Sequence, residues 1–331
     1  MVKQKTLTYG QALHDALSCT MRRDKSVIIL GCGVTSPSGV LGTIIGFDRR
    51  FGPDRVIETP IAENGMTGVA IGAALAGMRP VIIHQRMDFV LMSMDQIVNH
   101  AAKWNYMLGG NRPMPLVIRC IVGQGWGQGP QHSQSFQSLF ANIPGLKVVM
   151  PSNPYDAKGL LIASVYDNNP VIFIEHKMLY NMQSLVPEGH FTVRLGSAHV
   201  VRRGRHISVI AVSQLVQEAR KAAGILKESY GIDIEIVDPR TIKPFDEPTI
   251  LRSVKKTGRV LIADVGWKTC GFGAEVAAFC SENAFRELKA PVTRLGFPDC
   301  PSPTAQSLEE AYYIDSGRIV DACVKLMYRL S

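Results

Sequence analysis

The sequence predicts an α/β protein with two layered domains, each built on a parallel sheet. A chain of 331 residues is too long for one ordinary core and fits two domains. Short β-branched runs alternate with helical patterns along the whole length. A polar, irregular stretch at 185–205, rich in Gly and Pro, separates two such series. We therefore expect domains at 1–189 and 190–331.

Eight apolar runs are candidate strands, and most have no polar face. They are 26–30, 80–84, 115–122, 146–150, 170–175, 207–212, 233–238 and 259–264. Strands that are apolar on both faces are typical of parallel sheets covered by helices. Segments 94–108 and 213–229 have the periodicity of two of those helices.

Bulk properties exclude several classes of protein. The net charge is +8, but the basic residues are scattered, and Arg202, Arg203 and Arg205 are expected in a solvated turn, so no nucleic-acid partner is predicted. Seven cysteines without a Cys-x-x-Cys pair argue against a disulfide framework or a zinc site. The N-terminus lacks an apolar signal core, and no apolar run is long enough to cross a membrane. A cytoplasmic protein is expected.

Two glycine-rich segments fail as nucleotide-binding motifs. "GCGVTS" at 31–36 carries Ser36 where the dinucleotide fingerprint needs a third glycine. "GQGWGQGPQHSQS" at 123–135 contains no Gly-Lys-Ser/Thr. From residue type alone this second loop is either an ordinary polar loop or a mobile arm that brings His132 to a proton transfer.

Residues 58–77, "ETPIAENGMTGVAIGAALAG", predict a helix of small residues. Gly68 and Gly72 allow another backbone to approach closely, as at a subunit interface. Glu63 stands at the entrance of this apolar segment. If it is buried, its pKa rises, and the carboxyl becomes a hydrogen-bond donor suited to a ring nitrogen.

Several motifs together resemble one family. They are "RVIETPIAENGMTGVAIGAALAGMRPVI", "MDQIVNHAAKWNYMLGG", "GPQHSQSF", "PGLKVV", "YDAKGLL", "DPRTIKPFDEPTILRSVKKTGRVLIAD" and "CGFGAEVAA". In this order they resemble the β subunit of thiamine-diphosphate-dependent 2-oxoacid dehydrogenases of the pyruvate, branched-chain and acetoin type. The resemblance covers nearly the whole chain. It implies a transketolase-like pyrimidine-binding domain followed by a transketolase C-terminal domain.

The resemblance also implies roles for individual residues. Glu63 would hydrogen-bond the aminopyrimidine ring of the cofactor, and Phe89 would stack on that ring, with Ile61 beside it. His132 would serve in proton transfer and substrate orientation. The cofactor itself would act as the electron sink.

The family holds the diphosphate and its Mg²⁺ with a Gly-Asp-Gly segment, which this sequence lacks. The resemblance therefore implies an α subunit that supplies this half of the site, in an α2β2 assembly, with a lipoyl acyltransferase core as a candidate further partner. It also implies a K⁺ ion held by backbone oxygens, at positions that match Leu116, Ser164, Val165, Asp167 and Asn169.

The chain departs from the family pattern near the cofactor. Cys32 and Gly33 replace acidic residues, and Trp126 and Gln128 make the glycine loop bulkier. His84 and Arg86 precede Phe89, where apolar or aromatic residues are usual, and together with Gln128 they are candidate substrate-binding residues. Arg86 either pairs with Asp88 or a neighbour, or binds a carboxylate or phosphate of the substrate.

Two catalytic functions stay open on this basis. One is the 2-oxoacid dehydrogenase, which passes an acyl group to a lipoyl arm. The other is a two-chain transketolase-like enzyme that moves a two- or three-carbon unit to a sugar or carbonyl acceptor. A non-catalytic partner that keeps the fold is a third possibility, but the joint presence of Glu63, Phe89 and His132 argues against it.

Overall fold

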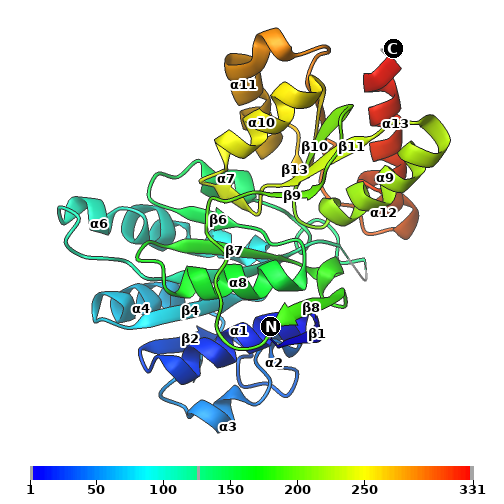
Figure 1. Cartoon of the computed structure of the whole chain (residues 1–331). Coiled ribbons are helices and arrows are strands. Elements are labelled where there is room, and N and C mark those ends of the chain that lie inside the picture. The colour runs from blue at the N-terminus through cyan, green and yellow to red at the C-terminus, as the bar shows by residue number, and fades with distance from the viewer. Residues whose placement is uncertain (1–2, 125–126, 329–331) are drawn as a thin grey trace. The chain divides into compact units, whose positions relative to one another are not determined.

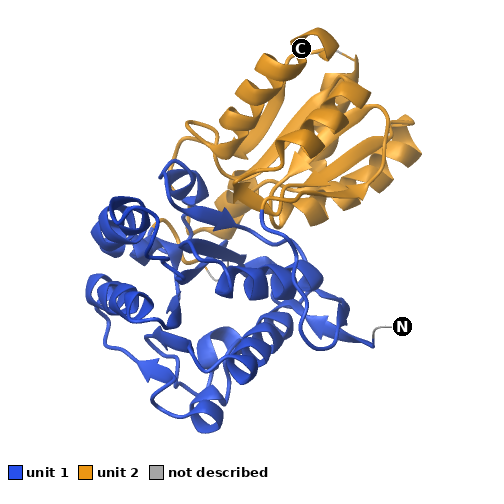
Figure 2. Ribbon diagram, turned by 60° about the vertical axis from the view of Figure 1, so that its left-hand side comes forward, with its two compact units in different colours: residues 1–125, 131–195 blue, residues 126–130, 196–331 orange. Residues whose placement is uncertain are grey.

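The computed structural model describes residues 3–124 and 127–328, arranged as two compact units (Figures 1 and 2). Unit 1 comprises residues 1–125 and 131–195, and unit 2 comprises 126–130 and 196–331. Residue 190, the expected boundary, lies between the last strand of unit 1 and the first strand of unit 2. Each unit is an α/β domain, so the chain has the two-domain α/β architecture that the sequence predicts.

Unit 1 is a parallel sheet flanked by helices. Its elements are β1 (Gln4–Thr8), α1 (Tyr9–Arg23), β2 (Val27–Gly31), α2 (Gly39–Gly42), α3 (Phe47–Phe51), β3 (Val56–Glu58), α4 (Glu63–Leu75), β4 (Arg79–His84), α5 (Met87–Val90), η1 (Leu91–Ser93), η2 (Gln96–Ala101), α6 (Trp104–Met107), β5 (Val117–Val122), α7 (Gln137–Ala141), β6 (Lys147–Val149), α8 (Pro154–Val165), β7 (Val171–His176), η3 (Lys177–Leu179) and β8 (Gln183–Pro187). Six strands follow the order β6-β7-β5-β4-β2-β3, with every neighbouring pair parallel. Strands β1 and β8 form a separate antiparallel pair.

Unit 2 repeats the plan on a smaller scale. Its elements are β9 (His199–Arg202), β10 (Ile207–Ala211), α9 (Leu215–Tyr230), β11 (Ile234–Asp238), β12 (Thr241–Lys243), α10 (Glu247–Thr257), β13 (Val260–Trp267), α11 (Phe272–Ala284), η4 (Phe285–Glu287), β14 (Thr293–Phe297), α12 (Gln306–Tyr312) and α13 (Ser316–Tyr328). The sheet order is β14-β13-β10-β11-β9, parallel except for the edge strand β9. Helix α9 packs on α13, and α10 packs on α11 (Figure 1).

All eight predicted strands exist, but the segment expected as a helix at 94–108 is broken. It contains the π-helix η2, where Ala102 N–H donates to Ile97 O at 3.0 Å, and then the short helix α6. A wide π turn of this kind interrupts the regular backbone pattern and re-aims the side chains that follow.

The core of unit 1 contains a charged pair inside otherwise apolar strands. Arg119 of β5 and Glu175 of β7 are fully buried, with Arg119 Nε 2.5 Å and Nη2 2.9 Å from the carboxylate oxygens. Thr43 accepts a hydrogen bond from Arg119, and Tyr180 donates one to Glu175. Because each charge has partners, the pair ties neighbouring strands together without leaving an isolated buried ion.

All seven cysteines are free. Across the described part of the chain, no helix combines the length and apolar character that a membrane crossing requires.

Candidate active site

The candidate site lies where β4, β5 and β7 end. The strand register aligns His84 with Cys120, and Val122 with His176, so the residues after these strands leave the same edge of the sheet. In open parallel α/β sheets, ligands bind outside the carboxyl ends of the strands. Polar and aromatic side chains gather at this edge.

Phe89 and His132 are in direct contact although 43 positions separate them in the sequence. Their rings meet edge to face, with centroids 5.2 Å apart and an interplanar angle of 80°. Phe89 lies on the short helix α5 and is 39% exposed, so part of its ring is open to a ligand. The structure therefore brings together two residues that were predicted from separate motifs.

Asp88 anchors the segment that carries His132. Its Oδ1 accepts hydrogen bonds from the backbone N–H of Gln134 at 3.2 Å and from Gln134 Nε2 at 2.8 Å. The other oxygen, Oδ2, is buried without a hydrogen-bond partner. Burial raises the pKa of Asp88, although the bonds from Gln134 and the charge of Arg86 act in the opposite direction. The sequence motif "MDF" contained Asp88, but its role as an anchor depends on a contact that only folding creates.

His84 is buried in a small polar network. Its Nε2 lies 3.3 Å from Thr67 Oγ1, which donates to Ser93 Oγ at 3.0 Å. Its Nδ1 is buried and has no hydrogen-bond partner. Burial lowers the pKa of His84 to about 4, so the ring is neutral at physiological pH. The network joins β4 to helix α4 and the turn η1.

Glu63 begins α4, one helical turn before Thr67, and thus lies on the same face of that helix. Glu63 is half-buried rather than fully buried, and Ala62, Asn64 and Gly65 beside it are open to solvent. Ile61 is 79% exposed at the bend before the helix. In the first turn of α4, Asn64 and Gly65 are therefore open to solvent, whereas Met66 is buried.

Arg86 is buried and donates from Nη1 to Gly123 O at 3.3 Å. Gly123 in turn lies against His176, since a Cβ at this glycine would fall 2.7 Å from the imidazole ring. Lys177 directly follows His176. Burial, and to a smaller extent the positive charge of Arg86, lower the pKa of Lys177 to about 8. Sequence reasoning missed His176 and Lys177, although their place directly after an apolar strand was a usable signal.

Gln128 groups with unit 2, and its flanking glycines lie against Thr304 of that unit. Its Oε1 is buried without a hydrogen-bond partner. Trp126, the other bulky residue of the glycine loop, lies outside the described residues.

The loop after β2 lacks the acidic residues that are usual in the family, but a carboxylate from strand β3 binds it. Glu58, at the end of β3, accepts hydrogen bonds from Gly33 N at 2.5 Å and from Thr35 N and Oγ1 at 2.9 Å. Burial favours a higher pKa for Glu58, but these bonds outweigh it and keep the pKa below its ordinary value. The loop that contains Cys32 is therefore ordered by a carboxylate that the sequence motif did not point to.

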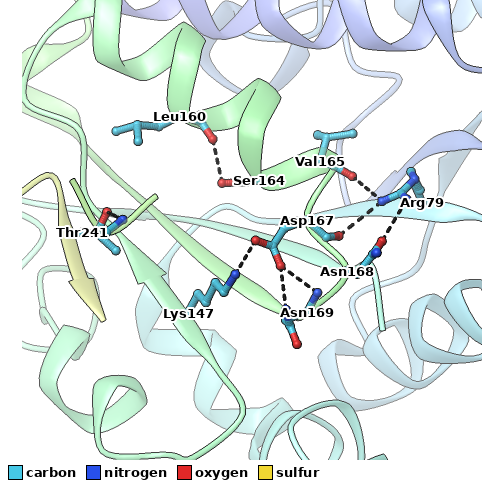
Figure 3. A network of polar contacts seen from close by, with 10 residues as sticks. Arg79, Lys147, Leu160, Ser164, Val165, Asp167, Asn168, Asn169 and Thr241 are labelled. Atoms are coloured by element: carbon cyan, nitrogen blue, oxygen red, sulfur yellow. Dashed lines mark hydrogen bonds and ion pairs between the residues drawn. The ribbon is translucent and has the colours of Figure 1, made fainter. Parts of the chain in front are cut away.

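Four of the residues matched to a K⁺ site, Ser164, Val165, Asp167 and Asn169, lie at the end of α8 and in the turn before β7 (Figure 3). Arg79 Nη1 donates to Val165 O at 3.1 Å and to Asp167 O at 3.3 Å, and Lys147 pairs with the Asp167 carboxylate at 2.5 Å (Figure 3). Leu116 O and Ser164 O accept backbone bonds from Val171 and Asp167. A carbonyl oxygen has two lone pairs, so these contacts leave acceptor capacity at the loop. In residues 3–124 and 127–328, no group of three or more His, Cys, Asp and Glu side chains is suited to hold a metal ion.

Comparison with known proteins identifies the class. Residues 5–183 match the transketolase pyrimidine-binding domain, and residues 196–319 match the transketolase C-terminal domain. A split-gene transketolase structure described as an inactive β4 tetramer superposes with a TM-score of 0.80, at 21% identity, over 97% of this chain and 98% of the other. That likeness shows the fold. The chain belongs to the transketolase family of two-domain α/β proteins.

Sequence relatives define its branch of the family. The acetoin:2,6-dichlorophenolindophenol oxidoreductase β subunits of Cupriavidus necator and Bacillus subtilis are 41% and 38% identical, each over 98% of both chains. The pyruvate dehydrogenase E1 component β subunit of Porphyra purpurea is 43% identical over 94% of both chains. This chain belongs with those β subunits, the E1-type components of thiamine-diphosphate-dependent 2-oxoacid dehydrogenases.

Proposed function

We propose that this chain is the β subunit of a thiamine-diphosphate-dependent 2-oxoacid dehydrogenase and forms the aminopyrimidine half of its active site. The contact between Phe89 and His132 carries the proposal. The two residues come from separate sequence motifs, and the resemblance implies that both act at the same cofactor. In the structure their rings are in contact, next to the carboxyl ends of the strands.

The exposed first turn of α4 and the open part of the Phe89 ring fit an aromatic cofactor ring. Glu63 would hydrogen-bond the aminopyrimidine, Phe89 would stack on it, and Ile61 would cover its edge. His132 would move a proton at the substrate. When bound, thiamine diphosphate supplies the electron sink for cleaving the bond next to a 2-oxo carbonyl.

The Mg²⁺ and the diphosphate are assigned to an α-type partner, in an α2β2 assembly. The sequence has no Gly-Asp-Gly segment, and Mg²⁺ prefers carboxylate, phosphate and water oxygens in a dedicated pocket. Transfer of the acyl group to a lipoyl acyltransferase core belongs to the same proposal.

A K⁺ ion is proposed at the turn between α8 and β7, held by backbone oxygens of Leu116, Ser164, Val165, Asp167 and Asn169. Arg79 already donates to Val165 O and Asp167 O, so each of these two carbonyls would offer the ion its second lone pair. The expected result is a higher melting temperature in KCl than in tetramethylammonium chloride at equal ionic strength. Equal melting temperatures would remove the ion from the proposal.

The decisive test is Glu63→Gln in the enzyme reconstituted with its α-type partner. The amide cannot donate the carboxyl proton, so we expect the exchange of the reactive cofactor C–H with deuterated water to slow roughly hundredfold. Glu228→Gln, an exposed glutamate of α9, serves as the matched control. Unchanged exchange in Glu63→Gln would reject the proposed role of Glu63.

A transketolase-like transfer is the second candidate function, because Arg86 and Lys177 place two cations at the site edge. A product analysis with a sugar-phosphate acceptor distinguishes it from acyl transfer to lipoamide.

A further inference from the structure

Three buried polar side chains from three different elements meet at one hydroxyl group. Thr67 of α4, His84 of β4 and Ser93 of η1 are each at most 2% exposed. Thr67 Oγ1 lies 3.3 Å from His84 Nε2 and donates to Ser93 Oγ at 3.0 Å. A hydroxyl carries one hydrogen, and that of Thr67 goes to Ser93, so His84 Nε2 carries the hydrogen that it donates to Thr67. The network therefore connects the end of a strand to two helical segments.

This network lies about one helical turn from both residues that are proposed to bind the aminopyrimidine. Glu63 and Thr67 are four positions apart on α4 and share a face of that helix. Phe89 and Ser93 are also four positions apart, with helical backbone through α5 and η1. Glu63 and Phe89 are partly open to solvent, whereas Thr67 and Ser93 are fully buried. The bond between Thr67 and Ser93 thus joins the two segments just below their partly open residues.

Hydrogen bonds fix the separation of these segments more strictly than apolar contacts would. Apolar side chains of similar size would fill the same space without selecting one distance, whereas buried hydrogen bonds restrict both distance and angle. The next position of α4 is also tightly placed, because a Cβ at Gly68 would lie 3.3 Å from Gln96 Oε1 of η2. Two neighbouring positions of α4 are therefore held against the chain that follows Phe89.

We propose that Thr67, His84 and Ser93 form a positioning network that sets the separation of Glu63 and Phe89, and with it the width of the slot for an aminopyrimidine ring. This inference rests on the proposed function, because it takes Glu63 and Phe89 as the residues that bind the ring. His84, at the end of β4, anchors the network to the sheet. The three side chains act through Glu63 and Phe89 and need no contact with the cofactor.

Hydrogen–deuterium exchange of the full-length chain without cofactor tests the link between the two segments. Thr67→Val keeps the shape of the side chain and removes both bonds, so the amides of 66–70 and 89–94 are expected to exchange roughly tenfold faster. Thr67→Ser retains the hydroxyl and should restore slow exchange. Ser93→Ala removes only one of the two bonds and should accelerate exchange in both segments to a smaller extent. Unchanged exchange in Thr67→Val would overturn the inference.

Thr257→Val is the matched control, because Thr257 belongs to a comparable buried hydroxyl network in unit 2. Ser208 Oγ there lies 2.6 Å from Ser253 Oγ and 2.8 Å from Thr257 Oγ1. The control should lose a similar amount of thermal stability and leave exchange at 66–70 and 89–94 as in the unaltered chain. Equally fast exchange of those amides in the control would mean that they respond to any loss of stability, and the inference would be rejected.

Titration of the reconstituted enzyme with magnesium thiamine diphosphate tests the consequence for the cofactor. Thr67→Val is expected to raise Kd roughly tenfold, whereas Thr67→Ser and Thr257→Val should bind nearly as tightly as the unaltered enzyme. An unchanged Kd in Thr67→Val would show that the slot does not depend on the network and would reject the inference. If the unaltered enzyme bound no thiamine diphosphate while the effects on exchange persisted, the proposed function would fail, and only the link between the two helical segments would stand.

Discussion

At the scale of single residues, Asp88 couples two groups that have separate tasks. It precedes Phe89 on α5, and its carboxylate holds Gln134, two residues after His132. A hydrogen bond with a charged partner contributes about 1.5 to 3 kcal/mol, enough to select one position of a loop. We therefore predict that Asp88 is a positioning residue, which would act on the reaction through His132.

This role predicts non-additive effects of Asp88→Ala and Gln134→Ala. Either change breaks the same tie, so each is expected to lower kcat about tenfold, and the double variant no further than either single one. Hydrogen exchange of the amides at 131–136 is expected to speed up in all three variants. Asn99→Ala, which breaks a comparable contact with the exposed Asp95, serves as the control. Additive losses in kcat would contradict the shared tie.

His84 makes the stability of the chain depend on pH. Its pKa falls from 6.5 to about 4 in the folded state because burial disfavours the charged ring. The unfolded chain therefore takes up the proton first as the pH drops, and stability is lost between about pH 6.5 and 4. The loss amounts to about 3 kcal/mol.

Urea unfolding of the full chain at neutral pH and near pH 4 checks this expectation. His84→Gln should lose less stability over this interval than the unaltered chain, because the amide does not titrate. His100→Gln, at a partly exposed histidine, should behave like the unaltered chain. An identical pH dependence in His84→Gln would show that this ring does not cause the loss.

The sequence predicted several residues of the candidate site, but not the contacts that join them. Glu63, Phe89 and His132 follow from motifs, and the structure brings Phe89 and His132 into contact. The anchor between Asp88 and Gln134 joins residues 46 positions apart, and no local pattern encodes that distance. Lys177 was not predicted, because a lysine after a strand is common in sequences. Only the folded structure shows that it interacts with the buried Arg86.

At the scale of elements, helix α4 has two different faces. Thr67, Ala70, Ile71 and Ala74 are buried against this chain. On the other side Gly65, Val69, Gly72 and Ala76 are exposed, and a Cβ at Gly72 would meet nothing within 4 Å. A helix side made of small residues with one exposed valine fits close contact with another backbone better than it fits solvent.

Gly72→Leu tests whether the exposed face of α4 contacts another subunit or solvent. Replacing a helical glycine with leucine favours the helix by up to about 1 kcal/mol, so the isolated chain should keep or gain thermal stability. If the α-type partner packs on this face, the same side chain should prevent assembly, as measured by native mass spectrometry. Gly224→Leu in α9 offers the same gain at another open glycine and should leave assembly intact. Normal assembly of Gly72→Leu would exclude this face as the contact.

Strands were easier to predict than the segments between them. A buried parallel strand such as β5 or β10 is a continuous apolar run, which periodicity detects. The three-residue strand β3 and the edge strand β9 carry too few apolar residues to stand out. The π turn in η2 could not be predicted, because the residues before and after a local widening of a helix keep the same helical periodicity.

At the scale of the whole molecule, the chain has two family domains, and we propose that it supplies only one half of the cofactor site. Phe89 and Glu63 would provide an aromatic face and a carboxyl group for the aminopyrimidine, whereas the 331 residues contain no Gly-Asp-Gly segment for a magnesium-bound diphosphate. Most of the charge of thiamine diphosphate is on that diphosphate, so ionic affinity should come mainly from the partner.

Calorimetric titration with magnesium thiamine diphosphate tests this division. The isolated chain is expected to bind it at least roughly hundredfold more weakly than the assembly with the α-type subunit, a difference of about 2.7 kcal/mol. Thiamine without the diphosphate should show a much smaller gain on assembly, because it lacks the group that the partner binds. Tight binding of magnesium thiamine diphosphate by the isolated chain would mean that its own residues hold the metal-bound diphosphate. The half-site assignment would then be wrong, and the partner would be needed for something other than cofactor binding.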